Sequence, residues 1–206
     1  MDRSVTVTGS ASVDAVPDVA RVTSGLVSEA ATASAALAAN SETMAALIAG
    51  LKSAGVEAKD IATGSFRVEP RYVHDGNGRN PKMDGYQVNN EVAVTVRDLS
   101  RLGRLLDEMV KLGANRIGGL SFEVSGADKL KDEARRLAVA DARRKADLFA
   151  RAAGAEVGAV LRIAEDGDVM APRPQFAARA AMAGGVPIER GTQSLEAHVT
   201  VTWGLR

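Results

Sequence analysis

The longest helical pattern in the chain runs from Asp128 to Ala153 and is followed by Gly154. Its apolar residues recur at spacings of three and four, which places them along one side of a helix. They are Leu130, Ala134, Ala138, Ala142, Ala146, Phe149 and Ala153. Because most of them are alanines, whose side chain is a single methyl group, this side can lie close to a flat partner such as a sheet.

Charged side chains fill the rest of this segment. Acids precede bases by four residues in the pairs Asp132 with Arg136, Asp141 with Lys145, and Asp147 with Arg151. Such pairs stabilise a solvated helix by about 0.2–0.5 kcal/mol each. Ser125 and Asp128 resemble a capping box at the start of the helix, and Gly154 suits the left-handed conformation that ends one.

The charge balance narrows the range of partners. The 206 residues include 26 basic and 26 acidic ones, and acids are interleaved with the bases of the long helix. We therefore interpret the basic residues as a solvated face and expect no nucleic-acid binding. The absence of cysteine excludes disulfides, thiolate nucleophiles and zinc–thiolate sites. No apolar run reaches the length of a transmembrane segment.

Further segments alternate between apolar and polar residues with the period of a strand. They are 5–11, 19–27, 61–69, 86–97, 117–124, 157–164 and 195–205. Because only Pro17-Asp18 breaks the pattern between the first two segments, we expect them to pair as antiparallel neighbours. Helices are predicted from a start between Ser28 and Thr32 to about Ala54, with Leu37, Met44, Leu47, Ile48 and Leu51 on one side, and from Asp98 to Leu112.

An internal repeat organises the first part of the chain. The segment 61–68 matches 117–124 in spacing, and each copy follows a strand, an amphipathic helix and a glycine. The match indicates two strand–helix–strand units, at about 19–69 and 86–125, whose strands share one sheet. A chance match is the alternative.

Each strand has one aliphatic face and one face of Thr, Ser, Asn or Glu, which is unlike the apolar runs of a parallel sheet covered on both sides. We predict an α+β fold in a single domain, 1–206. It is a two-layer sandwich of a mixed, mainly antiparallel sheet with helices on one face. It consists of the two repeats, a long third helix at about 128–153 and a C-terminal strand. Trp203 is expected in its core.

An irregular arm at about 166–193 separates the last two strands. Prolines and glycines interrupt it, yet it is too apolar for a simple linker. Its apolar residues include Met170, Phe176, Ala180, Ala181 and Met182. We predict that the arm packs against a neighbouring subunit or lies over its own sheet.

Residues that could carry chemistry are few. His74 lies beside Asp75 in a glycine-rich loop and suits a surface position, whereas His198 shares a polar strand face with Glu196 and Thr200. A metal pair or an acid–base dyad of His198 and Glu196 is conceivable, but two ligands do not make a site. We therefore assign no catalytic, cofactor-binding or metal-binding residue, expect no cofactor, and predict that the protein is not an enzyme.

Several short motifs, in order, resemble the SIMPL-domain family of bacterial periplasmic immunogenic proteins and proteins linked to oxidative-stress defence. The motifs are 5–9, 16–20, 98–99 with 113–115, 132–135 with 141–146, 187–189 and 199–203. The resemblance implies an envelope-located α+β protein, exported by a cleaved signal peptide, with no accepted enzymatic activity and a tendency to form ring-like or larger homo-oligomers. No catalytic residues follow from it.

Residues 1–4 lead directly into a strand pattern, without the basic region and apolar core of a secretory signal. A cytoplasmic chain and a mature form with a new initiating methionine both fit this start, and the resemblance favours the periplasm.

The resulting hypothesis is a non-enzymatic cell-envelope protein that assembles with copies of itself through sheet edges and the arm 166–193, and supports envelope or oxidative-stress tolerance. The alternative is a binding module that holds a peptide or a small apolar ligand on the open sheet face or at the seam between helix and sheet. An enzyme using His198 and Glu196 is the third possibility, in which His198→Ala would abolish a metal or substrate effect.

Overall fold

The computed structural model describes residues 3–74, 81–165, 173–175 and 188–206. Contacts divide the chain into two compact units, each with its own sheet and core. Unit 1 comprises Met1–Pro17, Val124–Arg179 and Arg190–Arg206, and unit 2 comprises Asp18–Glu123 and Ala180–Glu189. The single domain expected over 1–206 stays a prediction.

Unit 2 contains the two predicted repeats. Its strands are β2 (Val19–Ala30), β3 (Ile61–His74), β4 (Pro81–Val96) and β5 (Arg116–Glu123). They form one antiparallel sheet in the order β3-β4-β2-β5, so both strand–helix–strand units share a sheet. With one helix in each repeat, this order is that of the ferredoxin-like split βαβ fold.

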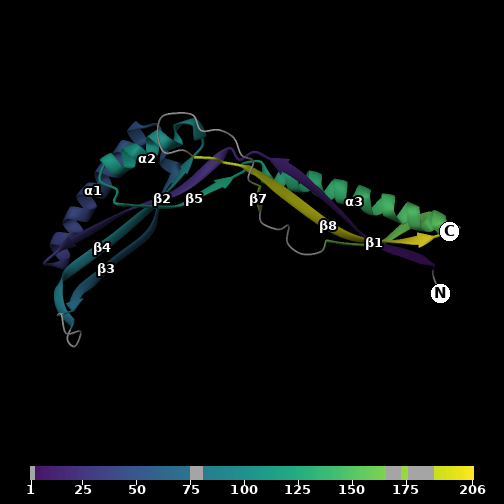
Figure 1. Ribbon diagram of the computed structural model, residues 1–206, viewed down its shortest axis with the longest axis horizontal. Coiled ribbons are helices and arrows are strands. Elements are labelled where there is room, and N and C mark those ends of the chain that lie inside the picture. Colours follow the sequence, from purple (N-terminus) through teal and green to yellow (C-terminus); the bar gives the residue numbers. More distant parts are fainter. Residues whose placement is uncertain (1–2, 75–80, 166–172, 176–187) are drawn as a thin grey trace. The chain divides into compact units, whose positions relative to one another are not determined.

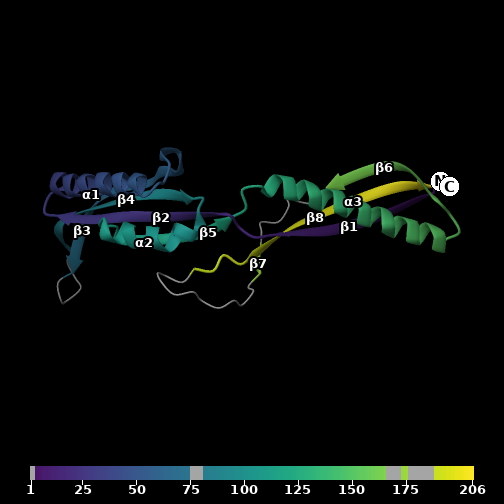
Figure 2. The same cartoon turned by 90° about the horizontal axis from the view of Figure 1, so that it is seen from above.

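The helices of unit 2 are α1 (Ala33–Ser53) and α2 (Leu102–Lys111), with the short 3-10 turns η1 (Ala58–Asp60) and η2 (Leu99–Arg101) (Figure 2). The hydroxyl of Thr32 accepts a hydrogen bond from the backbone N–H of Ala35 and thereby caps α1. Side chains from both helices and from the central strands form one core cluster, which includes Val22, Leu26, Met44, Leu47, Leu51, Val92, Val94, Leu106 and Met109. Leu37, predicted on the same side of α1, is exposed, whereas Asn40 is fully buried.

Unit 1 contains β1 (Ser4–Ala15), α3 (Ala127–Ala152), β6 (Val157–Glu165), β7 (Arg173–Gln175) and β8 (Thr192–Leu205) (Figure 1). Its sheet has the order β1-β8-β6, with β7 paired to the start of β8. The predicted pairing of the first two strands is therefore wrong. β1 pairs along its whole length with β8, from Ser4 opposite Gly204 to Ala15 opposite Gln193, while β2 belongs to the other sheet.

Helix α3 packs on β1 and β8 through alanines spaced four residues apart. Ala134, Ala138, Ala142, Ala146 and Ala150 are buried. A step of four residues turns about 40° past a full turn, so this row drifts around the helix and can follow the twist of the strands below it. Consequently Phe149, predicted in the row, is exposed and Ala150 takes its place. Ala153 lies beyond the end of α3 and is also exposed.

The ends and ion pairs of α3 were predicted in part. Gly154 has a φ of +69°, as expected for the end of the helix. The N-cap residue is Gly126, one position after the Ser125 of the predicted capping box, and Gly126 makes no side-chain cap hydrogen bond. Asp141 pairs with Lys145 as predicted, but Asp132 pairs with Arg135 and Asp147 with Arg143, since these bases lie within reach on the helix surface.

The α+β class, the antiparallel pairing and the one-sided packing of helices are confirmed. In β8 the side chains from Leu195 to Trp203 alternate between a face buried under α3 and a face that no described helix covers. Trp203 is 2% exposed and lies in the core of unit 1, as predicted.

Most of the predicted arm, including Met170, Phe176, Ala180, Ala181 and Met182, lies outside the described residues. Its described parts are more regular than expected, because β7 pairs with β8 and β8 already begins at Thr192. Ile188 packs, partly buried, on the core of unit 2.

Candidate functional site

The predicted pair of His198 and Glu196 lies on the uncovered face of β8. The Nε2 atom of His198 is 3.8 Å from the Oε2 atom of Glu196, and both side chains are more than two-fifths exposed. Ser10 and Ser12 lie opposite them on β1. The side chain of His74 and all of Asp75 lie outside the described residues.

In the part of the chain that the structure describes, no three His, Cys, Asp or Glu residues gather as metal ligands would. The uncovered face next to His198 instead carries a ladder of hydroxyl groups. The Oγ1 atoms of Thr6 and Thr202 are 2.9 Å apart, and those of Thr8 and Thr200 are 2.8 Å apart. These hydroxyls bond to one another across β1 and β8, which stabilises the strand pair.

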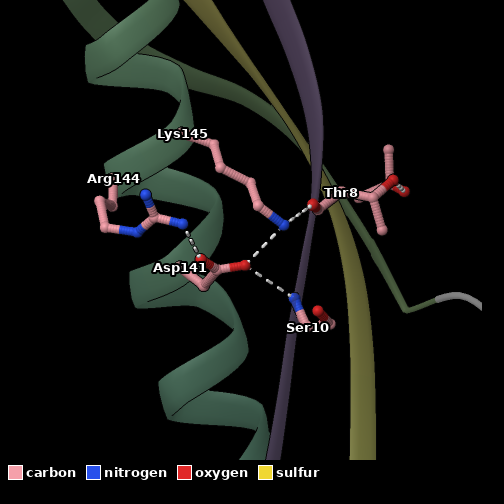
Figure 3. A network of polar contacts seen from close by, with 6 residues as sticks. Thr8, Ser10, Asp141, Arg144 and Lys145 are labelled. Atoms are coloured by element: carbon pink, nitrogen blue, oxygen red, sulfur yellow. Dashed lines mark hydrogen bonds and ion pairs between the residues drawn. The ribbon is translucent and has the colours of Figure 1, made fainter.

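The outer edge of β1 is occupied by side chains of α3 (Figure 3). A carboxylate oxygen of Asp141 accepts a hydrogen bond of 3.1 Å from the backbone N–H of Ser10. The ammonium group of Lys145 donates a bond of 3.0 Å to the backbone carbonyl of Thr8 and lies 2.7 Å from Asp141. An unpaired strand edge invites another strand, and charged groups placed on its backbone prevent this. The edge of β1 is therefore closed in its middle.

The carboxylate of Asp141 has three donors. Lys145 contributes most and Arg144 next, at 2.7 Å, followed by the N–H of Ser10, and together they lower the pKa of Asp141 well below its ordinary value. The sequence predicted only the pair of Asp141 with Lys145, because a helical pattern shows which residues are neighbours on the helix but not which strand edge they reach.

The opposite edge of this sheet is β6, which exposes three large aliphatic side chains besides the charged Arg162 and Glu165. Val160, Leu161 and Ile163 are 52%, 59% and 57% exposed. β8 is the sole described strand paired with β6. Arg135 of α3 reaches over to Glu165 at a distance of 2.8 Å, but this contact is at the end of the strand. The described part of unit 1 thus has one closed edge and one open, aliphatic edge.

The outer strands of unit 2 also expose apolar side chains. Phe66 and Val68 of β3 lie opposite Asn90 and Val88 of β4 and are at least two-fifths exposed. Ile117 and Leu120 are similarly exposed on β5. Bulges interrupt the pairing of β3 between Thr63 and Ser65 and again between Pro70 and Tyr72.

Comparison with known proteins gives a family and several relatives. The model of the SIMPL family, described as a protein of unknown function (DUF541), matches residues 5–203. The 26 kDa periplasmic immunogenic protein of Brucella melitensis is 35% identical over 98% of this chain and 84% of its own length. The uncharacterized protein YggE of Edwardsiella ictaluri is 30% identical over 83% of this chain and 71% of its own. The uncharacterized protein YggE of Escherichia coli is 33% identical over 77% of this chain and 64% of its own length. None of the helices within the described ranges combines the length and apolarity needed to cross a membrane.

Proposed function

Because the chain belongs to the SIMPL family, we propose that it is a non-enzymatic protein of the bacterial periplasm that works by assembling with further copies of itself. The names of the Brucella relatives support the compartment. A contribution to envelope integrity or oxidative-stress tolerance, implied by the family resemblance, is part of the same proposal and would follow from the assembly.

The observation that carries the assembly is the open aliphatic edge of β6. Val160, Leu161 and Ile163 each keep more than half of their surface in water. Covering the exposed part of such a side chain contributes on the order of 1 kcal/mol. Exposed aliphatic side chains on an edge strand are normally covered, and no described element covers those of β6, which supports a contact surface there.

The two edges of this sheet differ, which restricts how copies can meet. The edge of β1 is occupied by Asp141 and Lys145 and cannot accept a strand there. A repeating contact of β6 with β1 is therefore disfavoured, and two β6 edges meeting around a twofold axis is the arrangement that remains for this sheet.

Irregularities in β6 also restrict the contact. The pairing of β6 with β8 shifts register on both sides of Val160, whereas Arg162 to Glu165 pair without interruption. A bulged strand bends away from a regular ladder. We propose that the β6 strands of two copies meet through their aliphatic side chains and through the short regular segment at Ile163.

Cross-linking through a single introduced thiol tests this contact, since the chain has no cysteine of its own. Ile163→Cys should form a disulfide-linked dimer rapidly on mild oxidation. Leu148→Cys is the matched control, because Leu148 is 59% exposed but lies on α3, away from the strand edge. Dimer formation at the same slow rate in both variants would rule out β6 as the contact.

A further inference from the structure

A small pocket lies within unit 2, between the turn that ends α1, the end of β4 and the first turns of α2. Its volume is about 220 Å³. A water molecule takes up about 30 Å³ in the liquid, so the pocket holds roughly seven waters or one small organic molecule. Val56, Val96 and Leu105 contribute apolar side chains to its lining. Val96 and Leu105 are each 5% exposed and therefore form a fixed floor.

Charged side chains surround this floor, and internal contacts hold several of them in place. Arg97 donates two hydrogen bonds to the carboxylate of Asp60, from Nε at 2.9 Å and from Nη2 at 2.8 Å. These bonds lower the pKa of Asp60, whose carboxylate is nearly buried. A guanidinium held by two parallel bonds to a carboxylate has a fixed orientation. This pair forms a rigid wall of the pocket.

The turn after α1 provides another fixed wall. Gly55 has a φ of +89°, a conformation that favours glycine. A Cβ atom at Gly55 would lie 3.0 Å from a nitrogen of Arg101, so the guanidinium packs directly over the glycine. Arg101 also donates a hydrogen bond to the carbonyl of Ala54, the C-cap residue of α1. The pocket is therefore formed before any ligand binds.

Two further charged side chains of the lining lie on α2. Glu57 pairs with Lys59 at 2.7 Å, and Asp98 accepts a hydrogen bond of 2.6 Å from the hydroxyl of Ser100. By contrast, Arg104 and Glu108 are exposed, and Arg104 acts on the carboxylate of Asp98 through its charge without a direct hydrogen bond. They lie one turn apart on α2, and so the pocket presents one available cation and one available anion above an apolar floor.

This combination selects the charge of the ligand. The lining carries four acidic side chains and three arginines, so acids exceed bases by one and the pocket does not favour a phosphate or another multiply charged anion. A purely apolar molecule would make no use of the charges of Arg104 and Glu108. A zwitterion with a short apolar body satisfies both groups and covers the floor.

We propose that this pocket binds a single apolar α-amino acid, with its carboxylate at Arg104, its ammonium group at Glu108 and its side chain over Val56, Val96 and Leu105. The ligand site is independent of the proposed assembly, because every lining residue belongs to unit 2 and none to β6. It gives the chain a sensing or carrier property in addition to assembly.

Calorimetric titration with L-leucine tests the proposal, with 4-methylpentanoate and 3-methylbutylamine as analogues that lack the ammonium or the carboxylate. Leucine should bind saturably, and each analogue should bind at least about tenfold more weakly. Arg104→Gln should weaken leucine binding about tenfold without changing the binding of the amine. Glu108→Gln should weaken leucine binding to a similar degree without changing the binding of the carboxylate.

The control variants are Lys111→Gln and Asp107→Asn, which make the same charge changes on exposed positions of α2 outside the pocket. They should bind leucine like the unmodified protein, and circular dichroism should show an unchanged fold in all four variants. The proposal is overturned if leucine gives no saturable heat at concentrations of about 10 mM. It is also overturned if either analogue binds as tightly as leucine, or if the control variants weaken binding as much as Arg104→Gln and Glu108→Gln.

Discussion

Gly9 of β1 lies directly against Ala142 of α3, with no space for a side chain between them. A Cβ atom on Gly9 would be 2.7 Å from the Cβ of Ala142 and 2.0 Å from the carbonyl oxygen of Ala138. The helix can approach the strand this closely only because both positions have the smallest side chains. The same approach brings Asp141 and Lys145 onto the backbone of Ser10 and Thr8.

Replacing Gly9 with alanine tests this close contact. We expect Gly9→Ala to lower the free energy of unfolding by about 1–3 kcal/mol, because the added methyl group forces α3 away from β1. Gly118→Ala is the matched control, since Gly118 also lies in a strand but a Cβ there would meet no atom within 4 Å. Denaturant unfolding of the two variants measures the difference, and equal stabilities would contradict the contact.

Trp203 and Phe149 provide a second comparison on unit 1. Trp203 is 2% exposed beneath α3, so Trp203→Ala should lower the free energy of unfolding by about 3–5 kcal/mol. Phe149 is 54% exposed, and Phe149→Ala should change the free energy of unfolding by no more than about 0.5 kcal/mol. Thermal unfolding of both variants distinguishes this arrangement from the one predicted from sequence. In that arrangement Phe149 faces the sheet, and Phe149→Ala would destabilise the protein about as much as Trp203→Ala.

Asp141 should make the stability of the protein depend on pH in the acid range. The pKa of Asp141 is lowered in the folded state, chiefly by Lys145. At pH values between the lowered pKa and the ordinary one, the unfolded chain therefore binds more protons than the folded chain. The stabilisation is fully present above the ordinary aspartate pKa of about 4 and is lost as the pH falls below it. Asp141→Asn should therefore lower the melting temperature at pH 7. The difference in melting temperature between this variant and the unmodified protein should become smaller as the pH is lowered.

Glu133→Gln is a control for the charge of α3, because Glu133 pairs with Arg136 on the same helix and its ion pair does not involve β1. At pH 7 its effect on the melting temperature should be smaller than that of Asp141→Asn. A difference between Asp141→Asn and the unmodified protein that stays constant from neutral to acid pH would contradict the role of the ionised carboxylate.

Asn40 connects α1 to the sheet of unit 2. Its amide nitrogen donates hydrogen bonds to the carbonyl oxygens of Leu26, at 3.2 Å, and of Val88, at 3.3 Å. Asn40→Ala leaves both buried carbonyls without this donor and should lower the free energy of unfolding by about 1–3 kcal/mol. Ser41→Ala, at the next and exposed position of the same helix, should be within about 0.5 kcal/mol of the unmodified protein. If Asn40→Ala left the free energy of unfolding unchanged, these hydrogen bonds would not contribute to stability.

Most helices and strands could be predicted from the sequence. The spacing of apolar residues in a segment depends on which of its faces is buried, and this spacing differs between helices and strands. The repeat of 61–68 in 117–124 located the edge strands β3 and β5, and the strand alternation identified the buried face of β8 that ends in Trp203. These signals lie within short segments, so the separation of their partners along the chain does not matter.

Long-range pairing was not predictable in the same way. β1 was expected beside the next strand, yet Val5 lies opposite Trp203 near the other end of the chain. Both candidate partners alternate with the same period, so the pattern alone cannot choose between them. The lining of the pocket was missed for a similar reason, since Asp60, Arg97 and Arg104 are ordinary surface charges until the sheet brings them together.

The mass of the particle in solution tests the central claim most directly. Light scattering at micromolar concentration should give a multiple of the 21.4 kDa chain mass for the unmodified protein. The double variant Val160→Lys/Ile163→Lys, which places charges on the open edge of β6, should give a smaller particle. A mass of 21.4 kDa for the unmodified protein, or the same larger mass for both proteins, would contradict assembly through this edge.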